Sequence, residues 1–273
     1  MVEQLVEKYL TQLNINTSLT GLSLISHIKA QHIAALPFSS SNVILNANLS
    51  LDEDALFERL VFNKTGGYCF EHNKVMYVVL KQLGFNVRPL ITRVLLDDNE
   101  GNGRLHRVTL LEFEGEKYIV DVGFGVMNPR FIVPLKNADI DTISGRYTIK
   151  AMANNHYRLE YTPTNAEPIT LYRFDLAEFT EMDCNIGHFY SSQFEGAAFV
   201  NNLVVSRVME NERVLIRNRE VTFFDDALNE QAVYPITSAQ QLYSLLIEHC
   251  LLDISECDVK KLFTFIAAKS AAK

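Results

Sequence analysis

Apolar residues recur every three or four positions along the first part of this 273-residue chain, which is the spacing of amphipathic helices. The first predicted helix follows from six such positions: Val2, Leu5, Val6, Tyr9, Leu10 and Leu13. Three more helices are predicted over residues 22–35, 51–62 and 73–83, and Pro37 ends the first of these three. We therefore expect the first eighty or so residues to form a helical unit.

The pattern then changes to short runs rich in β-branched and aliphatic residues, which favour strands. Strands are predicted over residues 87–96, 107–113, 117–122, 147–150, 157–161 and 169–174, and a later meander over residues 203–207, 213–217 and 220–224. Two helices close the chain, over residues 239–249 and 259–268. Helices followed by strands and then by a mixed end indicate an α+β protein.

The dipeptide Glu114-Gly115 separates two of these strands and favours a tight hairpin. With a two-residue turn, Val108 faces Asp121 in the pairing. Residues two apart on a strand share a face, so His106 points the same way as Asp121 and lies diagonally from it. A slip of one residue would place the two side chains on opposite faces. The spacing permits a His–Asp pair, and a backbone amide or an arginine is the alternative partner for Asp121.

Composition and charge narrow the class of protein. Hydrophobic residues make up 48% of the chain, enough for a sizeable core, and the net charge of -8 argues against a general nucleic-acid binder. No apolar stretch reaches membrane-spanning length. The four cysteines show no CxxC spacing, which predicts a cytoplasmic protein without a disulfide framework. The histidines show no paired ligand spacing, so no metal site is expected.

Cys69 directly follows a Gly-Gly-Tyr sequence and precedes the predicted helix over residues 73–83. A thiol there lies near backbone N–H groups and the positive end of a helix dipole, which favour a thiolate. The alternative is a small apolar residue buried at a helix start. The chain order Cys69, His106, Asp121 matches a nucleophile, its base and the residue that orients the base in many thiol acyl-transfer enzymes.

Several separated motifs follow one another along the chain: Pro37-Phe38, Gly66-Gly67-Tyr68-Cys69-Phe70-Glu71-His72-Asn73, Leu105-His106-Arg107-Val108, Val120-Asp121-Val122-Gly123-Phe124-Gly125 and Phe199-Val200-Asn201-Asn202-Leu203. In sequence and in order they resemble the motifs of the arylamine N-acetyltransferases. The resemblance extends over most of the chain and is weakest beyond about Thr222. The nucleophile and aspartate motifs are specific, whereas Pro-Phe alone is not.

The resemblance implies three parts: a helical bundle over residues 1–84, a β-barrel-like domain over residues 85–190 and an α/β lid over residues 191–273. It also implies an enzyme that takes an acetyl group from acetyl-CoA, a co-substrate rather than a bound cofactor, and transfers it to an aromatic amine or hydrazine. In these terms Cys69 is the acetylated nucleophile, His106 its base and Asp121 the residue that orients His106. Attack by the thiolate and then by the amine predicts ping-pong kinetics.

Four residues are candidates for contact with substrate. On the resemblance, Phe38, Tyr68 and Phe124 would form an apolar acceptor pocket, and ordinary core packing is the alternative. Gly125 ends a Gly-Phe-Gly turn that can bring the backbone close to a ligand, and a plain turn after a strand is the alternative.

Three arginines, Arg213, Arg217 and Arg219, lie on one face of a predicted strand. CoA carries phosphates, so this face could meet them. A solvated strand face is the alternative, and backbone N–H groups of the glycine loop can bind phosphate instead.

The sequence departs from the family pattern at two positions. Thr65 stands where the family usually has an arginine before the glycine pair, and Ser39 stands where it has an acidic residue after Pro-Phe. Losing a cation and an anion together suggests that a supporting ion pair is absent as a unit. We therefore expect Thr65 and Ser39 to lie close together and to form or bridge a neutral contact.

Three other functions compete with acetyl transfer. An amide synthase would use the same triad on a carrier-bound acyl chain, and CoA recognition would distinguish the two. A thiol hydrolase or peptidase would pass the acyl group to water without depending on an amine. A binding protein with an inactive triad is the non-enzymatic alternative, and the presence of all three reactive residues argues against it.

Overall fold

The computed structural model describes residues 2–96, 99–164, 166–225 and 229–271. The N-terminal helices are α1 (Val2–Gln12), α2 (Gly21–Ala35), α3 (Ser41–Ile44), α4 (Glu53–Leu56) with a π-helical continuation (Phe57–Phe62), and α5 (Cys69–Gln82). Of these, α3 is the one that the apolar spacing did not predict. The apolar faces of the others meet in one core, to which Tyr9, Ile25, Leu60 and Val79 contribute.

The helix α5 is the central one, and most of its residues are buried. It begins at Cys69, four residues before the predicted start at residue 73. The prediction was wrong at this end because residues 69–72 are buried on all sides and show no helical alternation of polar and apolar positions. The Glu71 carboxylate accepts a hydrogen bond from the Tyr68 N–H (2.9 Å), which satisfies a backbone donor at the helix start. Cys69 therefore lies in the first turn of the helix itself.

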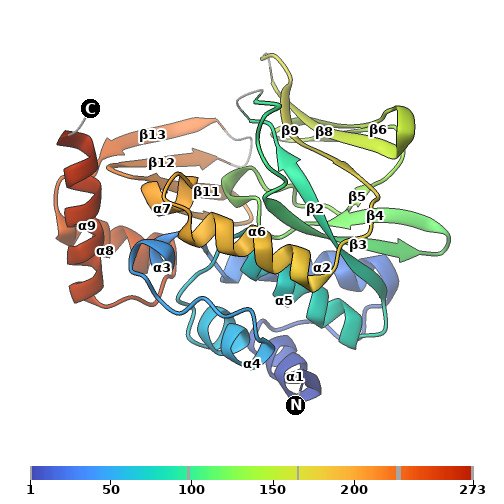
Figure 1. Cartoon of the computed structure of the whole chain (residues 1–273), viewed down its shortest axis with the longest axis horizontal. Coiled ribbons are helices and arrows are strands. Elements are labelled where there is room, and N and C mark those ends of the chain that lie inside the picture. The colour runs from blue at the N-terminus through green and yellow to red at the C-terminus, as the bar shows by residue number, and fades with distance from the viewer. Residues whose placement is uncertain (1, 97–98, 165, 226–228, 272–273) are drawn as a thin grey trace.

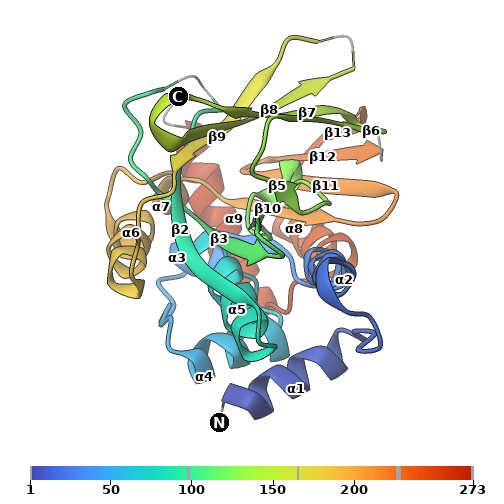
Figure 2. The same cartoon turned by 90° about the vertical axis from the view of Figure 1, so that its right-hand side faces the viewer.

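An eight-stranded antiparallel sheet lies over these helices. In sheet order its strands are β5 (Val133–Pro134), β4 (Glu116–Val120), β3 (His106–Phe113), β2 (Asn86–Val94), β9 (Ile169–Asp175), β8 (His156–Pro163), β7 (Gly145–Ala151) and β6 (Ala138–Thr142). Figure 2 shows α5 directly beneath β2 and β3. The sheet curves into a barrel-like wall around a second core of aliphatic and aromatic side chains.

The hairpin of β3 and β4 has the predicted register. Thr109 pairs with Val120, which places Asp121 one residue beyond the last pair and diagonal to His106. The turn residues at 114 and 115 have φ of 51° and 83°, as a two-residue type I′ turn requires. The turn thus fixes which side chains share a face at the far end of the hairpin.

A five-stranded antiparallel sheet is built from β1 (Phe38–Ser39), β10 (Val204–Val208), β11 (Glu212–Arg217), β12 (Glu220–Asp225) and β13 (Glu230–Pro235). Packed against it are α8 (Ala239–Ser244), its π-helical continuation (Leu245–His249), and α9 (Glu256–Ala271). Figure 1 shows this sheet beside the eight-stranded one, with α1, α4 and α5 below. The strand β1 comes from the N-terminal region, and its Phe38 pairs with Ser206 of β10. This pairing joins the N-terminal region to the five-stranded sheet. The division of the chain after residues 84 and 190 stays a prediction.

The helix α6 (Glu181–Gln193), followed by the short α7 (Ala198–Asn201), was not predicted from the sequence. Its solvent-facing side carries the large apolar residues Met182, Ile186 and Phe189. Its buried side carries small residues instead. The apolar period therefore does not mark the face that packs on α5 and β2.

Within the described ranges, no helix combines the length and apolar character needed to cross a membrane. The same residues contain no group of three or more His, Cys, Asp or Glu side chains that could hold a metal ion. The cytoplasmic location stays a prediction.

Candidate active site

Three side chains from distant parts of the sequence meet between α5 and the eight-stranded sheet. Cys69 opens α5, His106 opens β3 and Asp121 follows β4. All three are buried. His106 Nε2 lies 2.8 Å from Asp121 Oδ2, so the two residues form the pair that the hairpin spacing permits. Cys69 interacts with His106 through its side chain, and its Sγ lies 3.6 Å from Leu105 O.

The Asp121 carboxylate controls the protonation of His106. Burial opposes a charged imidazole, but the charge of Asp121 and its hydrogen bond outweigh burial and raise the pKa of His106 to about 10. Burial likewise opposes an ionised Asp121, and the charge and hydrogen bond of His106 outweigh it, so the pKa of Asp121 is lowered. Since Asp121 holds Nε2, Nδ1 is the ring nitrogen left for Cys69. A thiol beside an oriented base is the arrangement needed for nucleophilic catalysis.

Asn73 connects the nucleophile helix to the aspartate. Its Nδ2 donates hydrogen bonds to Asp121 Oδ1 (3.0 Å) and to Arg107 O (2.6 Å). Its Oδ1 accepts from the Val122 N–H (3.0 Å). Sequence analysis assigned Asn73 no role. The available signal was its spacing, since a residue four positions after Cys69 lies on the same face of the helix.

Gly123 allows the segment after Asp121 to lie against Cys69. A Cβ added at this position would lie 2.7 Å from the Cys69 Cα and 2.8 Å from the Asn73 Nδ2. The Gly123 N–H also donates to Asp121 Oδ1 (2.9 Å), which gives that oxygen a second partner. A residue without a side chain is therefore required for this close approach.

Cys69 and His106 open onto a cavity of about 410 Å³ with mostly apolar walls. Three of the four candidate substrate-contacting residues line it: Phe38, Phe124 and Gly125. Further walls, which sequence analysis did not identify, come from Leu96, Leu105, Met127, Phe199, Val204 and Leu215. The Cys69 thiol thus borders a space suited to an aromatic ring.

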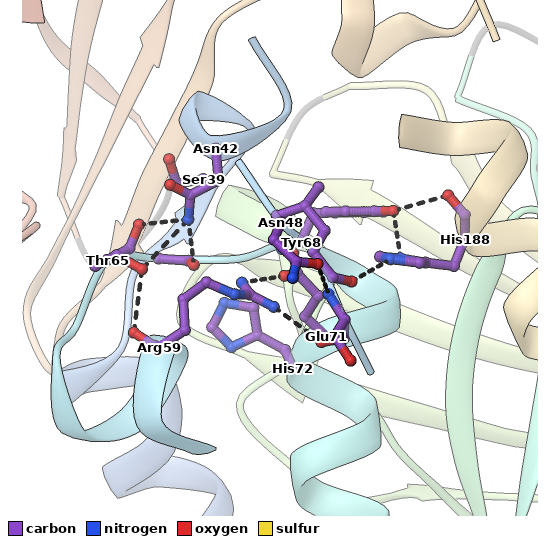
Figure 3. Close-up of polar contacts among 12 residues, drawn as sticks. Ser39, Asn42, Asn48, Arg59, Thr65, Tyr68, Glu71, His72 and His188 are labelled. Carbon is purple, nitrogen blue, oxygen red and sulfur yellow. Dashed lines mark hydrogen bonds and ion pairs between the residues drawn. The ribbon is translucent and has the colours of Figure 1, made fainter. Parts of the chain in front are cut away.

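Tyr68, the fourth candidate, is fully buried and is not among the residues that line this cavity. Its hydroxyl lies 2.6 Å from His188 Nδ1, and His188 Nε2 lies 2.8 Å from Leu49 O. Because His188 Nε2 donates to that carbonyl, Nδ1 accepts the Tyr68 proton. Figure 3 shows Tyr68 directed toward His188. The ring packs against Phe199, so Tyr68 supports a cavity wall from behind.

Glu71 and Arg59 support the loop that leads into Cys69. Arg59 forms an ion pair with Glu71, whose other oxygen accepts from the Tyr68 N–H. Figure 3 shows both contacts. The Glu71 side chain is buried, so the guanidinium supplies the counter-charge that a buried carboxylate needs.

Among the hydrogen bonds of the described residues, none joins Thr65 to Ser39 directly. Asn42 instead donates from Nδ2 to Thr65 O (3.0 Å), Thr65 Oγ1 (3.3 Å) and Gly66 O (3.2 Å). Ser39 donates its N–H to Gly67 O (2.6 Å) and pairs its hydroxyl with that of Ser41. Neutral hydrogen bonds therefore join the two segments, but they run through Asn42 and the main chain.

The three arginines of the late meander have different surroundings. Arg213 is buried and donates to Val126 O (2.6 Å), while Arg219 donates to Ile236 O (3.3 Å). Arg217 lines the cavity beside Cys69. Ser206, on the same face of the sheet, also lines it, and its buried hydroxyl has no hydrogen-bond partner among the described residues. Both side chains are placed to contact a bound molecule.

Comparison with known proteins gives consistent matches. A family model described as N-acetyltransferase matches residues 21–257. An arylamine N-acetyltransferase of Escherichia coli (strain K12) is 31% identical over 243 residues, which cover 87% of this chain and 83% of that protein. The solved structure of arylamine N-acetyltransferase from Salmonella typhimurium superposes with a TM-score of 0.88 at 26% identity, covering 97% of this chain and 98% of the other. The Mycobacterium marinum arylamine N-acetyltransferase in complex with CoA has the same fold, with a TM-score of 0.86 at 24% identity and coverage of 96% and 98%.

Proposed function

This chain belongs to the arylamine N-acetyltransferase family, and we propose that it moves an acetyl group from acetyl-CoA through a Cys69 thioester to the nitrogen of an arylamine or arylhydrazine. The family resemblance predicted from the motifs and the predicted α+β fold are both confirmed. One observation carries the proposed roles: Cys69 and His106 line one apolar cavity, and Asp121 holds His106 from behind through a hydrogen bond.

The first half-reaction forms the acyl-enzyme. His106 accepts the thiol proton, and Asp121 stabilises the resulting imidazolium. The Cys69 thiolate attacks the thioester carbonyl of acetyl-CoA, the carbonyl π electrons move to oxygen, and a tetrahedral intermediate forms. The intermediate collapses, the bond to the CoA sulfur breaks, and the departing sulfur takes the proton from His106.

The oxyanion of that intermediate needs hydrogen-bond donors. The backbone N–H of Cys69 is one candidate, because the first N–H groups of a helix have no partner within the helix. It also lies at the positive end of the α5 dipole, which favours negative charge.

The second half-reaction transfers the acetyl group. The amine nitrogen attacks the Cys69 thioester, His106 takes the proton that the nitrogen loses, and the sulfur leaves to regenerate the free enzyme. Phe38 and Phe124 supply apolar walls for an aromatic acceptor, and Gly125 lets the backbone approach it. Apolar walls also limit hydrolysis of the thioester by water.

Arg217 and Ser206 are the polar groups that we assign to substrate binding. Arg217 is a cation on the cavity wall and suits a CoA phosphate, whereas Arg213 is occupied by backbone carbonyls. The Ser206 hydroxyl can donate to, or accept from, a polar group of either substrate.

The first test is to weigh the intact protein after incubation with acetyl-CoA and no amine, beside Cys69→Ala. We expect a gain of one acetyl group in the wild type and none in the variant. The absence of an adduct, with Cys69 still alkylated quickly at neutral pH, would contradict acetyl-CoA as donor. That result would instead support an amide synthase acting on a carrier-bound acyl chain, which the relatives do not favour.

A further inference from the structure

Lys29 lies in the middle of α2 and is fully buried among the apolar residues of the helical core. Its neighbours along that helix, Ile25 and Ile28, are equally buried. The ammonium donates a hydrogen bond to the main-chain carbonyl of Asp121, with Nζ 2.7 Å from the oxygen. A lysine from the second helix thus reaches the backbone of the triad aspartate, 92 residues further along the chain.

A buried ammonium is costly unless an opposite charge lies close to it. Burial lowers the pKa of Lys29 to about 8, and the charge of Asp121 counteracts that effect. In return, Lys29 is one of the groups that lower the pKa of Asp121, after His106. Lys29 is therefore mainly protonated at neutral pH, and its charge acts on the carboxylate whose main chain it binds.

Three other ionisable groups of the helical core do not supply this charge. Tyr9, His32 and His72 form a hydrogen-bonded chain that ends at a backbone carbonyl of Pro37. Because His72 donates to that carbonyl, its other nitrogen accepts from His32, which accepts from Tyr9. Burial lowers the pKa of both histidines, that of His72 to about 4, so both are neutral at neutral pH.

Counting the buried charges shows what Lys29 contributes. When Cys69 is a thiolate and His106 an imidazolium, the site holds two anions and one cation without Lys29. With the ammonium, two anions and two cations balance. A balanced set of buried charges avoids most of the free-energy cost of isolating a charge from water.

We propose, on the basis of the acyl-transfer function assigned above, that Lys29 is a positioning residue that fixes the Asp121 main chain and balances the thiolate–imidazolium form of the site. Removing its charge makes the thiolate harder to form and the imidazolium harder to deprotonate. In a plot of activity against pH, the rise that follows Cys69 ionisation and the fall that follows His106 deprotonation then both move to higher pH. At an effective dielectric constant near 20, two charges about 10 Å apart change each other's pKa by about one unit, which sets the scale of the expected shift.

The test compares Lys29→Met, which keeps the length and removes the charge, with Lys29→Arg, which keeps the charge. Ile28→Val is the matched control, since it disturbs the same buried part of α2 without changing charge. The readout is the rate of Cys69 alkylation by iodoacetamide between pH 5 and pH 10. It is followed on the Cys69 peptide, because Cys257 is exposed and is alkylated as well. We expect the midpoint to rise by about one unit in Lys29→Met and to stay unchanged in Ile28→Val. Lys29→Arg should restore most of the wild-type midpoint.

An unchanged midpoint in folded Lys29→Met would overturn the proposal and leave Lys29 a structural residue. If Lys29→Met does not fold, the lysine amine can be titrated by NMR in the wild type and in Asp121→Asn. The midpoint of Lys29 should fall when the carboxylate charge is removed, and an equal midpoint would refute the coupling. Neither readout uses acetyl-CoA, so either can fail or succeed independently of the proposed acetyl transfer.

Discussion

Gly123→Ala should separate the aspartate segment from the nucleophile. The added Cβ would lie 2.7 Å from the Cys69 Cα, and ordinary contact begins near 3.4 Å. The two backbones must therefore move apart by roughly 0.7 Å. Neither neighbour can yield easily, because the Cα belongs to the first turn of α5 and the Asn73 amide is held by three hydrogen bonds.

The size of the effect follows from that displacement. Overpacking of a buried site costs typically about 1–3 kcal/mol of stability. A misplacement of about 1 Å in a reacting constellation can cost about a hundredfold in rate. We therefore expect acetylation of Cys69 to slow by roughly 10- to 100-fold, since the shift is somewhat smaller than 1 Å.

The assay is a quenched-flow measurement of acetyl-enzyme formation by mass spectrometry, with thermal unfolding measured in parallel. Gly84→Ala is the control: nothing lies within 4 Å of an added Cβ there, but φ is +85°, so backbone strain of about 1–2 kcal/mol lowers stability away from the site. It should unfold earlier yet acetylate at the wild-type rate. A Gly123→Ala protein that acetylates as fast as Gly84→Ala would refute the close approach of Gly123 to Cys69.

In the folded protein the pKa of His106 is about 10, above its ordinary 6.5, so its pairing with Asp121 stabilises the fold fully below pH 6.5 and loses this contribution as the pH rises to about 10. The difference in unfolding free energy between the wild type and His106→Gln should therefore shrink across that window. A constant difference would contradict the pairing. Asn73→Ala leaves buried groups of Asp121 and Val122 without a partner. Its free energy of unfolding in urea should fall by about 1–3 kcal/mol, and the rate of Cys69 acetylation should fall at least tenfold. Full activity would exclude a positioning role for Asn73. Arg217→Gln should raise KM for acetyl-CoA by a few-fold, with little change in kcat, and should leave KM unchanged for an acetyl-thioester donor that lacks phosphate. An equal change in KM with both donors would argue against a phosphate contact.

The hairpin that joins His106 to Asp121 could be predicted from the sequence because its turn has only two residues. A turn of that length fixes the register, and the register decides which side chains share a face. The pair then follows from local geometry alone. The motifs also predicted that Cys69 lies by a helix and that His106 and Asp121 lie on the two strands of a hairpin that follows it.

The start of α5 could not be predicted from apolar periodicity. Phe70, Glu71 and His72 are all buried, so polar and apolar positions do not alternate with the period of a helix. The Arg59–Glu71 ion pair makes burial of Glu71 acceptable, and it depends on a partner twelve positions earlier.

In α6 the large apolar residues face solvent, which reverses the usual signal.

The contacts around Asp121 could not be predicted from the sequence, because they depend on tertiary packing. Lys29 stands in a mixed helical pattern where a lysine is usually exposed, and only the fold brings it to the Asp121 carbonyl. The segments that carry Thr65 and Ser39 lie side by side as expected, but Asn42 and main-chain groups join them, not the two side chains themselves. Which polar side chain bridges two segments depends on distances of a few ångströms, and the sequence does not give them.

In the proposed mechanism, Cys69 carries the acetyl group between two substrates. The most direct measurement is to acetylate the protein with acetyl-CoA, remove CoA by gel filtration, and add 4-methoxyaniline or, separately, cyclohexylamine. We expect the aromatic amine to return Cys69 to its unmodified mass within the time of one turnover and to yield one equivalent of N-acetylated product. We expect cyclohexylamine to act far more slowly. Loss of the acetyl group at the same rate with buffer alone, or an adduct that the aromatic amine leaves intact, would contradict the mechanism.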